Sequence, residues 1–299
     1  MRYMNPGYVS WLERNTSLAV QEETGNPYAK ASFYVTKEKT CVYRLNLEKE
    51  LYIKASLWLY STSSTYTSCY IGAGTGYFSG VVFNKRDSDK WKAGYANSAW
   101  NIGCNVVREA EVKDNALNEI LLHFDGEKIE AFVNGTCVLD RSWTNKDIDL
   151  VIFSDEGKGH WSNLIISDEP IDIREHVIEL PVTLADVTMA KQEDGGYSSN
   201  KAGQILQYVL DAETLIRKYG EDSLVTGIGF QAEKAYRNGD SLTRLEEYLQ
   251  AEDGTEQNIG SMSLPTTDGQ VILGLPAEDI TLADMADKKL GYRSSWALK

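Results

Sequence analysis

The sequence predicts an all-β protein made of two antiparallel β-sandwiches. Asp125-Gly126 and Asn134-Gly135 each separate two short apolar runs, and such dipeptides favour tight hairpin turns because both residues tolerate positive φ. The run 52–60 alternates residue types with the two-residue period of a strand. Helical patterns are confined to two short stretches after residue 210. These three observations together favour sheets over helices throughout the chain.

The first part of the chain predicts a series of short strands. We expect strands at 8–12, 17–21, 31–35 and 41–45, followed by the clearer strand 52–60. In that strand, Ile53, Ala55, Leu57 and Leu59 share one face and are expected to be core. The other face is expected to be a concave or solvent face, and it carries Tyr52, Lys54, Ser56, Trp58 and Tyr60.

A glycine-rich run, 72–80, follows a predicted strand at 68–71. Its glycine spacing does not match a phosphate-binding loop, no lysine follows, and β-type residues flank it. We therefore interpret it as a loop of the sandwich. Further strands are expected at 81–83 and 103–108.

Residues 118–167 predict a meander of four strands, at 120–124, 129–133, 148–153 and 161–166. This meander resembles the second half of a concanavalin A-like or laminin-G-like jelly roll. The resemblance lies in the order of its elements: an apolar strand ending in His, an Asp-Gly turn, a strand ending Phe-Val-Asn-Gly, a strand, a Gly-rich loop and a strand ending Ile-Ile-Ser. The landmark is 130–135, EAFVNG. The resemblance covers residues 8–178 loosely and implies a fold rather than an activity, because such sandwiches bind sugars or proteins, cut polysaccharides or space other modules.

We expect a jelly-roll domain at 1–180, a linker or long loop at 181–204, and a smaller β-sandwich at 205–299. Polar, Gly- and Ser-rich residues indicate the linker. In the second domain Asp211 is placed to cap a helix at 214–219 that Gly220 ends, and a second short helix is expected at 279–285. Strands are expected at 224–230, 242–251, 258–264, 271–275 and 290–296.

Three segments of the second domain resemble modules of prophage-encoded tail or surface proteins: DAETLIRKYGEDSLVTGIGF, AYRNGDSLTRLEEY and LPAEDITLADMADKKLGYRS. This resemblance implies a virion protein of a phage or prophage, in a tail, a fibre or the decoration of a head. Other virion proteins and further copies of the same chain, as a homo-oligomer, are then the expected partners.

Charge and composition exclude several classes of protein. The net charge of −14 and the lack of a basic patch argue against nucleic-acid binding. No apolar stretch is long enough to span a membrane, and residues 1–15 lack the apolar centre of a signal peptide. We expect synthesis in the bacterial cytosol and release in the virion. The four cysteines have no zinc-site spacing and are expected to be free buried thiols, with disulfides after release as the alternative.

The sequence predicts a protein without enzymatic activity. Its three histidines, His123, His160 and His176, form no known catalytic motif. Endoglucanases of the concanavalin A-like fold carry Glu-x-Asp-x-x-Glu on one strand, and the nearest segment, 147–152, lacks both glutamates. Asp147 and Asp149 therefore have no outer partner for retaining hydrolysis.

Carbohydrate binding is the chemistry that the residues favour. A sugar site needs an aromatic platform with amide or carboxylate groups beside it, and loops at the edge of a sandwich supply both. The candidate residues are Trp91, Tyr95, Trp100, Trp143, Asn145, Asp155, His160 and Trp161. The alternative is that several of the Trp side chains fill the core. We expect no cofactor. Proteins of the jelly-roll type that this chain resembles often hold calcium at loop carboxylates, and Asp87, Asp89 and Asp155 are the candidates here, but they lack EF-hand-type spacing.

The leading hypothesis is a virion surface protein whose lectin-like domain binds a glycan or a protein of the host surface. A purely structural virion protein without a ligand and a polysaccharide-degrading hydrolase are the alternatives.

Overall fold

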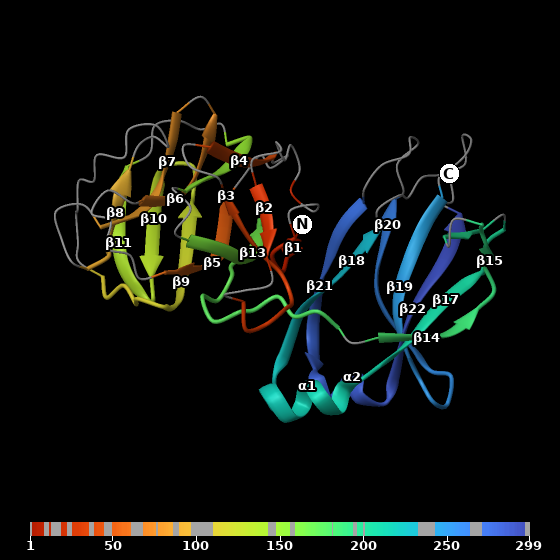
Figure 1. The fold of residues 1–299 in the computed structure, drawn as a ribbon. Helices are drawn as coiled ribbons and strands as arrows, with labels where there is room; N and C mark the ends of the chain where they lie inside the picture. Colours follow the sequence, from red (N-terminus) through yellow and green to blue (C-terminus); the bar gives the residue numbers. More distant parts are fainter. Residues whose placement is uncertain are drawn as a thin grey trace. The chain divides into compact units, whose positions relative to one another are not determined.

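The computed structural model describes residues 2–8, 12, 19–22, 26–35, 39–44, 50–60, 68–75, 77–85, 90–96, 110–142, 148–155, 159–180, 182–193, 196–199, 201–232, 243–263 and 271–296. The chain divides into two compact units, Met1–Glu179 (unit 1) and Leu180–Lys299 (unit 2). Both are built from antiparallel strands, which confirms the predicted all-β class (Figure 1). No helix in the described part of the chain has the length and apolar character needed to cross a membrane.

The first sheet of unit 1 has β13 (Gly159–Ser167) at its centre. On one side of β13 the order is β5, β9, β10 and β11, and on the other side β13 pairs with β1 and β3, with β2 beyond β3. The bounds are β1 Arg2–Asn5, β2 Ala19–Glu22, β3 Ser32–Val35, β5 Leu51–Leu59, β9 Ala116–Phe124, β10 Lys128–Val133 and β11 Thr136–Ser142. Strands more than 100 residues apart in the sequence, β5 and β13, are therefore neighbours.

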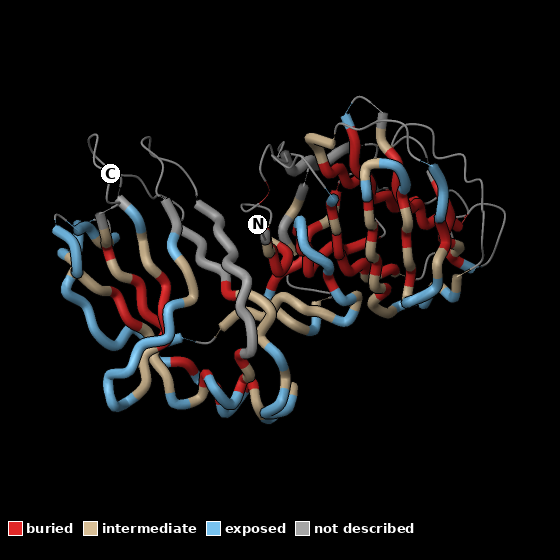
Figure 2. The backbone as a smooth tube through the Cα atoms, turned by 180° about the vertical axis from the view of Figure 1, so that it is seen from behind, coloured by how far each residue is buried: buried red, intermediate tan, exposed pale blue. Residues whose placement is uncertain are grey.

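The second sheet of unit 1 has the order β4-β12-β6-β7-β8. The bounds are β4 Lys39–Arg44, β6 Ser68–Thr75, β7 Tyr77–Asn84, β8 Lys92–Ala96 and β12 Leu150–Asp155. The core lies between the two sheets, where Phe153 of β12 meets Phe33 and Trp161 of the first sheet edge-on at centroid distances of 5.3 and 5.2 Å. Figure 2 marks many residues along the strands of unit 1 as buried. Aromatic pairs of this geometry add about 0.5–1.5 kcal/mol each beyond their buried area.

The predicted hairpins form as expected. Asn134 (φ 48°) and Gly135 (φ 81°) turn β10 into β11, and Gly126 (φ 87°) lies in the turn between β9 and β10. The Asp125 carboxylate accepts hydrogen bonds from the backbone N–H groups of Glu127 and Lys128, which closes that turn. The Asp-Gly and Asn-Gly signals are thus explained by positive φ and by a local side-chain cap.

The prediction of a loop at 72–80 is wrong, because residues 72–75 belong to β6 and residues 77–80 to β7. Gly72 and Gly80 face each other across the two strands. A Cβ at Gly72 would lie 2.2 Å from the Tyr70 hydroxyl, and a Cβ at Gly80 would lie 1.9 Å from the Ile71 carbonyl oxygen. The glycines therefore mark close approach of neighbouring groups rather than a loop.

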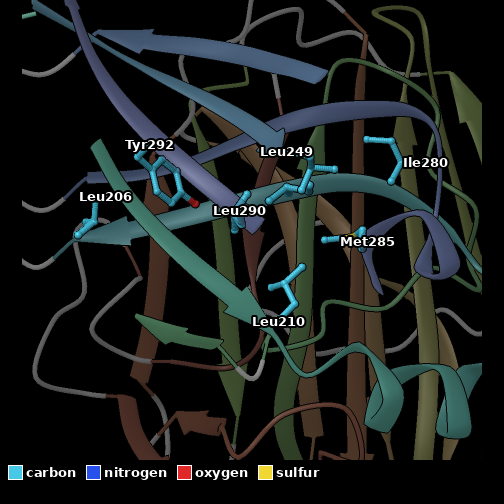
Figure 3. Packing of buried hydrophobic residues seen from close by; sticks show 8 residues of the cluster. Leu206, Leu210, Leu249, Ile280, Met285, Leu290 and Tyr292 are labelled. Atoms are coloured by element: carbon cyan, nitrogen blue, oxygen red, sulfur yellow. The ribbon is translucent and has the colours of Figure 1, made fainter. Parts of the chain in front are cut away.

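Unit 2 contains a five-stranded sheet in the order β14-β17-β22-β19-β20, together with the pairs β18–β21 and β15–β16. The bounds are β14 Val182–Val187, β15 Ala190–Lys191, β16 Tyr197–Ser198, β17 Ile205–Leu210, β18 Leu224–Ala232, β19 Thr243–Ala251, β20 Glu256–Ser263, β21 Val271–Thr281 and β22 Lys288–Trp296. The core is one apolar cluster that includes Leu206, Leu249, Leu290 and Met285 (Figure 3). The stretch 181–204, expected to be a linker or loop, contains β14, β15 and β16, because 182–187 is rich in residues that favour strands.

The two short helices are capped by their own sequence. Helix α1 (Ala212–Tyr219) begins two residues earlier than predicted, directly after Asp211, whose side chain accepts a hydrogen bond from the Thr214 N–H. It ends at Gly220 (φ 93°), as predicted. Helix α2 (Leu282–Ala286) begins later than predicted. Thr281 and Asp284 form a reciprocal capping box there, so residues 279–281 remain in β21.

Among the described residues of unit 2, one carboxyl group is buried. Glu247 of β19 is completely buried, and its Oε1 accepts a hydrogen bond of 2.8 Å from the Tyr292 hydroxyl. Its Oε2 is buried and has no hydrogen-bond partner. Burial raises the pKa of Glu247 to about 7, although the bond from Tyr292 acts in the opposite direction. This side chain is a pH-sensitive group within the fold of unit 2.

Candidate ligand-binding face

The structure places three of the predicted aromatic site residues in the interior of unit 1. Trp161 (0% exposed) faces Phe153 in the core, and Trp91 (4%) donates a hydrogen bond of 3.3 Å to the Tyr60 carbonyl oxygen. Tyr95 (8%) lies with its hydroxyl 3.3 Å from Ser79 Oγ and its ring under the Arg141 guanidinium. The prediction that Trp91, Tyr95 and Trp161 form exposed platforms is therefore wrong. Tyr95 lies on β8, Trp161 lies on β13, and Trp91 directly precedes β8. All three side chains are buried, which is the alternative that the sequence left open.

The other predicted residues lie outside the described part. Trp100, Trp143, Asn145, Asp87 and Asp89 all fall in segments that the structure does not describe. Asp155 ends β12, but its side chain also lies outside the described set. The calcium site at Asp87, Asp89 and Asp155 thus stays a prediction. Among the residues that are described, no group of three His, Cys, Asp or Glu side chains is arranged to hold a metal ion.

The outer face of the first sheet collects polar and aromatic side chains. On β5 the core residues are Leu51, Ile53, Ala55, Leu57 and Leu59, so the intervening residues point to the opposite face, as the alternation predicted. Strand register then places their neighbours. Trp58 lies opposite His160, Ser56 opposite Glu119, and Tyr52 opposite His123.

An aromatic cluster surrounds His160 at one end of this face; we define it as Tyr34, Trp58, Tyr60 and His160. The rings of Tyr34 and His160 are stacked at 5.3 Å, and Tyr60 meets His160 edge-on at 4.9 Å. Trp58 lies 6.5 Å from Tyr60. His160 is 7% exposed, whereas the other three residues are half-buried and so keep part of their surface accessible.

Polar groups border the aromatic cluster. His160 Nε2 lies 3.6 Å from Glu22 Oε2, and His160 Nδ1 lies 3.4 Å from Ser32 Oγ. The cluster therefore combines apolar ring surface with a carboxylate and hydroxyls within a few ångströms. Such a combination suits a ligand that has an apolar face and a hydroxylated rim.

A second group, centred on His123, lies on the same sheet face. The Tyr52 and His123 rings are stacked at 4.3 Å, and the Tyr52 hydroxyl donates a hydrogen bond of 2.6 Å to Glu50. His123 also reaches Glu50 through Nε2 at 2.7 Å and Glu130 through Nδ1 at 3.2 Å. Burial and the bond to Glu50 raise the pKa of Tyr52 to about 12, so its hydroxyl stays protonated. The same bond, with the contact to His123, lowers the pKa of Glu50.

Between these two groups lies a buried polar network around Lys54. Lys54 is fully buried, and its Nζ lies 2.6 Å from Glu119 and 3.1 Å from Ser56 Oγ. Ser56 Oγ donates to Glu119 at 2.6 Å and accepts from Asn163 Nδ2 at 2.9 Å. Ser56 is also fully buried and all its hydrogen-bonding capacity is used, so we assign it a structural role rather than that of a nucleophile.

Asn163 ties the segment that follows β13 to this network. It has φ 56° in an irregularity of β13 between Ser162 and Ile165, and its Oδ1 accepts a hydrogen bond from the Val177 N–H. Its Nδ2 lies 3.0 Å from His176 Nδ1. The His176 ring in turn stacks on Tyr28 at 3.7 Å. All three histidines of the chain thus stack on a tyrosine next to this sheet face, which the sequence analysis missed.

Lowering the pH should reduce the free energy of unfolding of unit 1, because protonation of His176 is unfavourable in the folded state. Burial, with a smaller effect from Lys54, lowers the pKa of His176 to about 4 from 6.5. The folded state therefore resists protonation, and the stabilisation present above pH 6.5 is lost as the pH falls toward 4. Because the ring is only half-buried, we expect a loss of about 1–2 kcal/mol. Urea unfolding of wild type and His176→Gln at pH 7 and 4.5 tests this: the variant should lose less stability, and equal losses would contradict the assignment.

Comparison with known proteins identifies no family for this chain, and the similar solved structures are distant. Neither a family model nor a curated protein matches the chain. A cellulose induced protein, Cip1, is similar over 53% of this chain and 89% of its own, with 10% identity and a TM-score of 0.38. A sialidase matches at 11% identity with a TM-score of 0.34, and sheep galectin-11, in a complex with glycerol, at 11% with 0.29. The match to the sialidase covers 51% of this chain and 16% of the sialidase chain. The match to the galectin covers 45% of this chain and 100% of the galectin chain.

The chain's own antiparallel sheets, rather than these neighbours, show the all-β class that the sequence predicted. The neighbours are weak matches to glycan-binding or hydrolase-like sandwich domains, and those named here include no phage protein. The prediction that the protein is not an enzyme is contradicted, because sialidases are among the similar structures, and we withdraw it.

Proposed function

We propose that unit 1 binds a glycan through the aromatic cluster. The observation that carries this proposal is the grouping of three half-buried aromatic side chains around His160, with the Glu22 carboxylate 3.6 Å from that histidine. A pyranose ring has an apolar C–H face and hydroxyls around its rim. The accessible ring surface of Trp58 and Tyr60 suits the C–H face, and the Glu22 carboxylate can accept hydrogen bonds from the hydroxyls.

The charges on this sheet face favour a neutral or amino-bearing glycan over an acidic one. Glu22, Glu50 and Glu130 all contact histidines on the outer face of the first sheet. The chain also carries a net charge of −14. A ligand with carboxylate or sulfate groups would be repelled on approach, whereas a neutral or cationic sugar would not.

Removal of the Trp58 side chain should weaken glycan binding. We expect Trp58→Ala to reduce affinity about tenfold or more, because truncation of a central aromatic contact typically costs above 1 kcal/mol. A glycan array screened with the whole chain identifies the ligand, and titration of wild type and variant measures the loss. Tyr52→Ala is the matched control: it removes an aromatic ring from the same face of β5 at the His123 end, and should leave affinity unchanged.

Equal binding by Trp58→Ala and wild type would contradict the proposed site. Loss of affinity in Tyr52→Ala alone would move the site to the His123 group. Thermal unfolding of each variant shows whether a loss of binding reflects a loss of fold.

The biological setting that we propose is the surface of a phage or prophage virion, where unit 1 would bind a glycan or protein of the host surface. The support is the resemblance of three segments of unit 2 to prophage tail or surface modules. Mass spectrometry of purified particles tests this directly. Stoichiometric incorporation without glycan binding would favour a purely structural virion protein, and release of reducing ends from a bound glycan would identify a hydrolase.

A further inference from the structure

Strand β14 ends the described five-stranded sheet of unit 2 and carries uncovered apolar side chains. It pairs with β17 on one side only. All six of its residues are exposed, including Val182 (43%), Leu184 (40%) and Val187 (36%). An end strand without a partner presents free backbone N–H and C=O groups, which form a template for another strand.

A β-bulge keeps the three apolar side chains of β14 on one face. Val182 lies opposite Leu210 and Leu184 opposite Tyr208, and after the irregularity at Ala185, Val187 lies opposite Leu206. Leu206, Tyr208 and Leu210 all belong to or contact the core cluster of unit 2. Without the extra residue, Val187 would point to the other face. The apolar side chains on the core face of the sheet therefore continue onto β14, where they are exposed.

The opposite end of the same sheet differs. Strand β20 begins Glu256-Gln257-Asn258, its described side chains are polar except for the half-buried Ile259, and it also contacts β21. The described part of β20 therefore has neither a set of exposed apolar side chains nor an uncovered edge that could pair with β14. Head-to-tail pairing of β14 with β20, which would build an open polymer, is therefore disfavoured.

We propose that β14 pairs antiparallel with β14 of a second copy of this chain across a two-fold axis. The two five-stranded sheets then form one continuous sheet, and Val182, Leu184 and Val187 of each copy cover those of the other. A strand running antiparallel to itself satisfies the symmetry of such a closed dimer, because the same patch serves both sides. This proposal is independent of the glycan site.

The charges of β14 permit this approach. Its one ionised side chain, Asp186, lies 2.7 Å from Lys289 Nζ, so two copies do not bring unpaired carboxylates together. The other five residues, Val182, Thr183, Leu184, Ala185 and Val187, are uncharged. A six-residue strand gives a small interface, so we expect a dimer of about micromolar affinity rather than an obligate one.

Sedimentation of the whole chain over a concentration series tests the proposal. We expect a monomer–dimer equilibrium that Leu184→Lys weakens at least about tenfold, because a charge would be buried at the pairing edge. Val209→Lys is the matched control: Val209 is 47% exposed on the neighbouring strand but lies opposite Thr183, on the other face of the sheet. It should dimerise like wild type.

Hydrogen exchange of β14 gives a second readout that does not depend on a variant. Its amides should become more protected as the concentration of wild-type protein rises. A monomer at every concentration, a dimer unaffected by Leu184→Lys, or a dimer broken by Val209→Lys alone would overturn the proposal. Urea unfolding of both variants identifies any loss of fold.

Discussion

Replacement of Glu119 by Gln should lower the free energy of unfolding of unit 1 by about 3–5 kcal/mol, the cost of leaving one member of a buried ion pair without its partner. Lys54 is fully buried and its Nζ lies 2.6 Å from Glu119 Oε2. In the variant a neutral amide replaces the carboxylate, so the ammonium group loses this counter-charge and keeps the Ser56 hydroxyl, at 3.1 Å. Urea unfolding followed by circular dichroism measures the change.

The destabilised variant should also gain stability with rising pH. Burial lowers the pKa of Lys54, while Glu119 acts to raise it. Loss of Glu119 lowers it further, so the folded state binds fewer protons than the unfolded state below pH 10.5, and stability recovers as the pH approaches that value. A pH-independent loss would contradict this cause.

Two further variants separate the charge from the packing. Lys54→Met together with Glu119→Gln removes both charges and should restore most of the stability, because an apolar side chain of similar volume replaces the buried cation. Asp172→Asn breaks the exposed pair with Arg174 and should change the stability little, because solvent screens the two charges. A loss for Glu119→Gln as small as that of Asp172→Asn would show that the buried pair does not stabilise the sheet.

Glu247→Gln should stabilise unit 2 at pH 8 by up to about 3 kcal/mol relative to wild type, and by little at pH 4. Burial raises the pKa of Glu247 from 4.5 to about 7. A raised pKa means that the contribution to stability is complete below pH 4.5 and is lost as the pH rises through 7. The amide has no such titration, and it can still accept the hydrogen bond from Tyr292.

Hydrogen exchange of peptides from β19 and β22 measures this effect within unit 2. Wild-type amides should exchange faster at pH 8 than at pH 4 after correction for the intrinsic rate, and those of Glu247→Gln should not. Glu246→Gln, at the neighbouring half-buried position, is the control and should behave like wild type. The same pH dependence in Glu247→Gln and wild type would show that another group is responsible.

Local sequence signals predicted the local structure well. Asn134-Gly135 gave a hairpin because both residues adopt positive φ, and Asp211 with Gly220 bounded α1 because each satisfies groups at a helix end. The alternation at 52–60 correctly separated the core face of β5 from the opposite face, but it did not show that Lys54 and Ser56 on that opposite face are fully buried. These features depend on neighbours within a few residues, which the sequence shows directly.

The candidate site was not predictable in the same way. The aromatic cluster depends on the pairing of β5 with β13, which brings Trp58 and His160 together across about a third of the chain. The sequence showed that 52–60 has a polar face, but it did not show which strands lie beside β5 and add side chains to that face. The buried positions of Trp91, Tyr95 and Trp161 also depend on which strand face meets the core, and sequence position alone does not reveal this.

Hydroxyl-radical footprinting of the whole chain, with and without the glycan found on the array, tests the proposed site most directly. The account predicts that bound glycan protects Tyr34, Trp58 and Tyr60 from oxidation while Tyr52 reacts as before. Protection confined to Trp100 or Trp143, with the aromatic cluster unaffected, would contradict it and place the ligand at the loops instead.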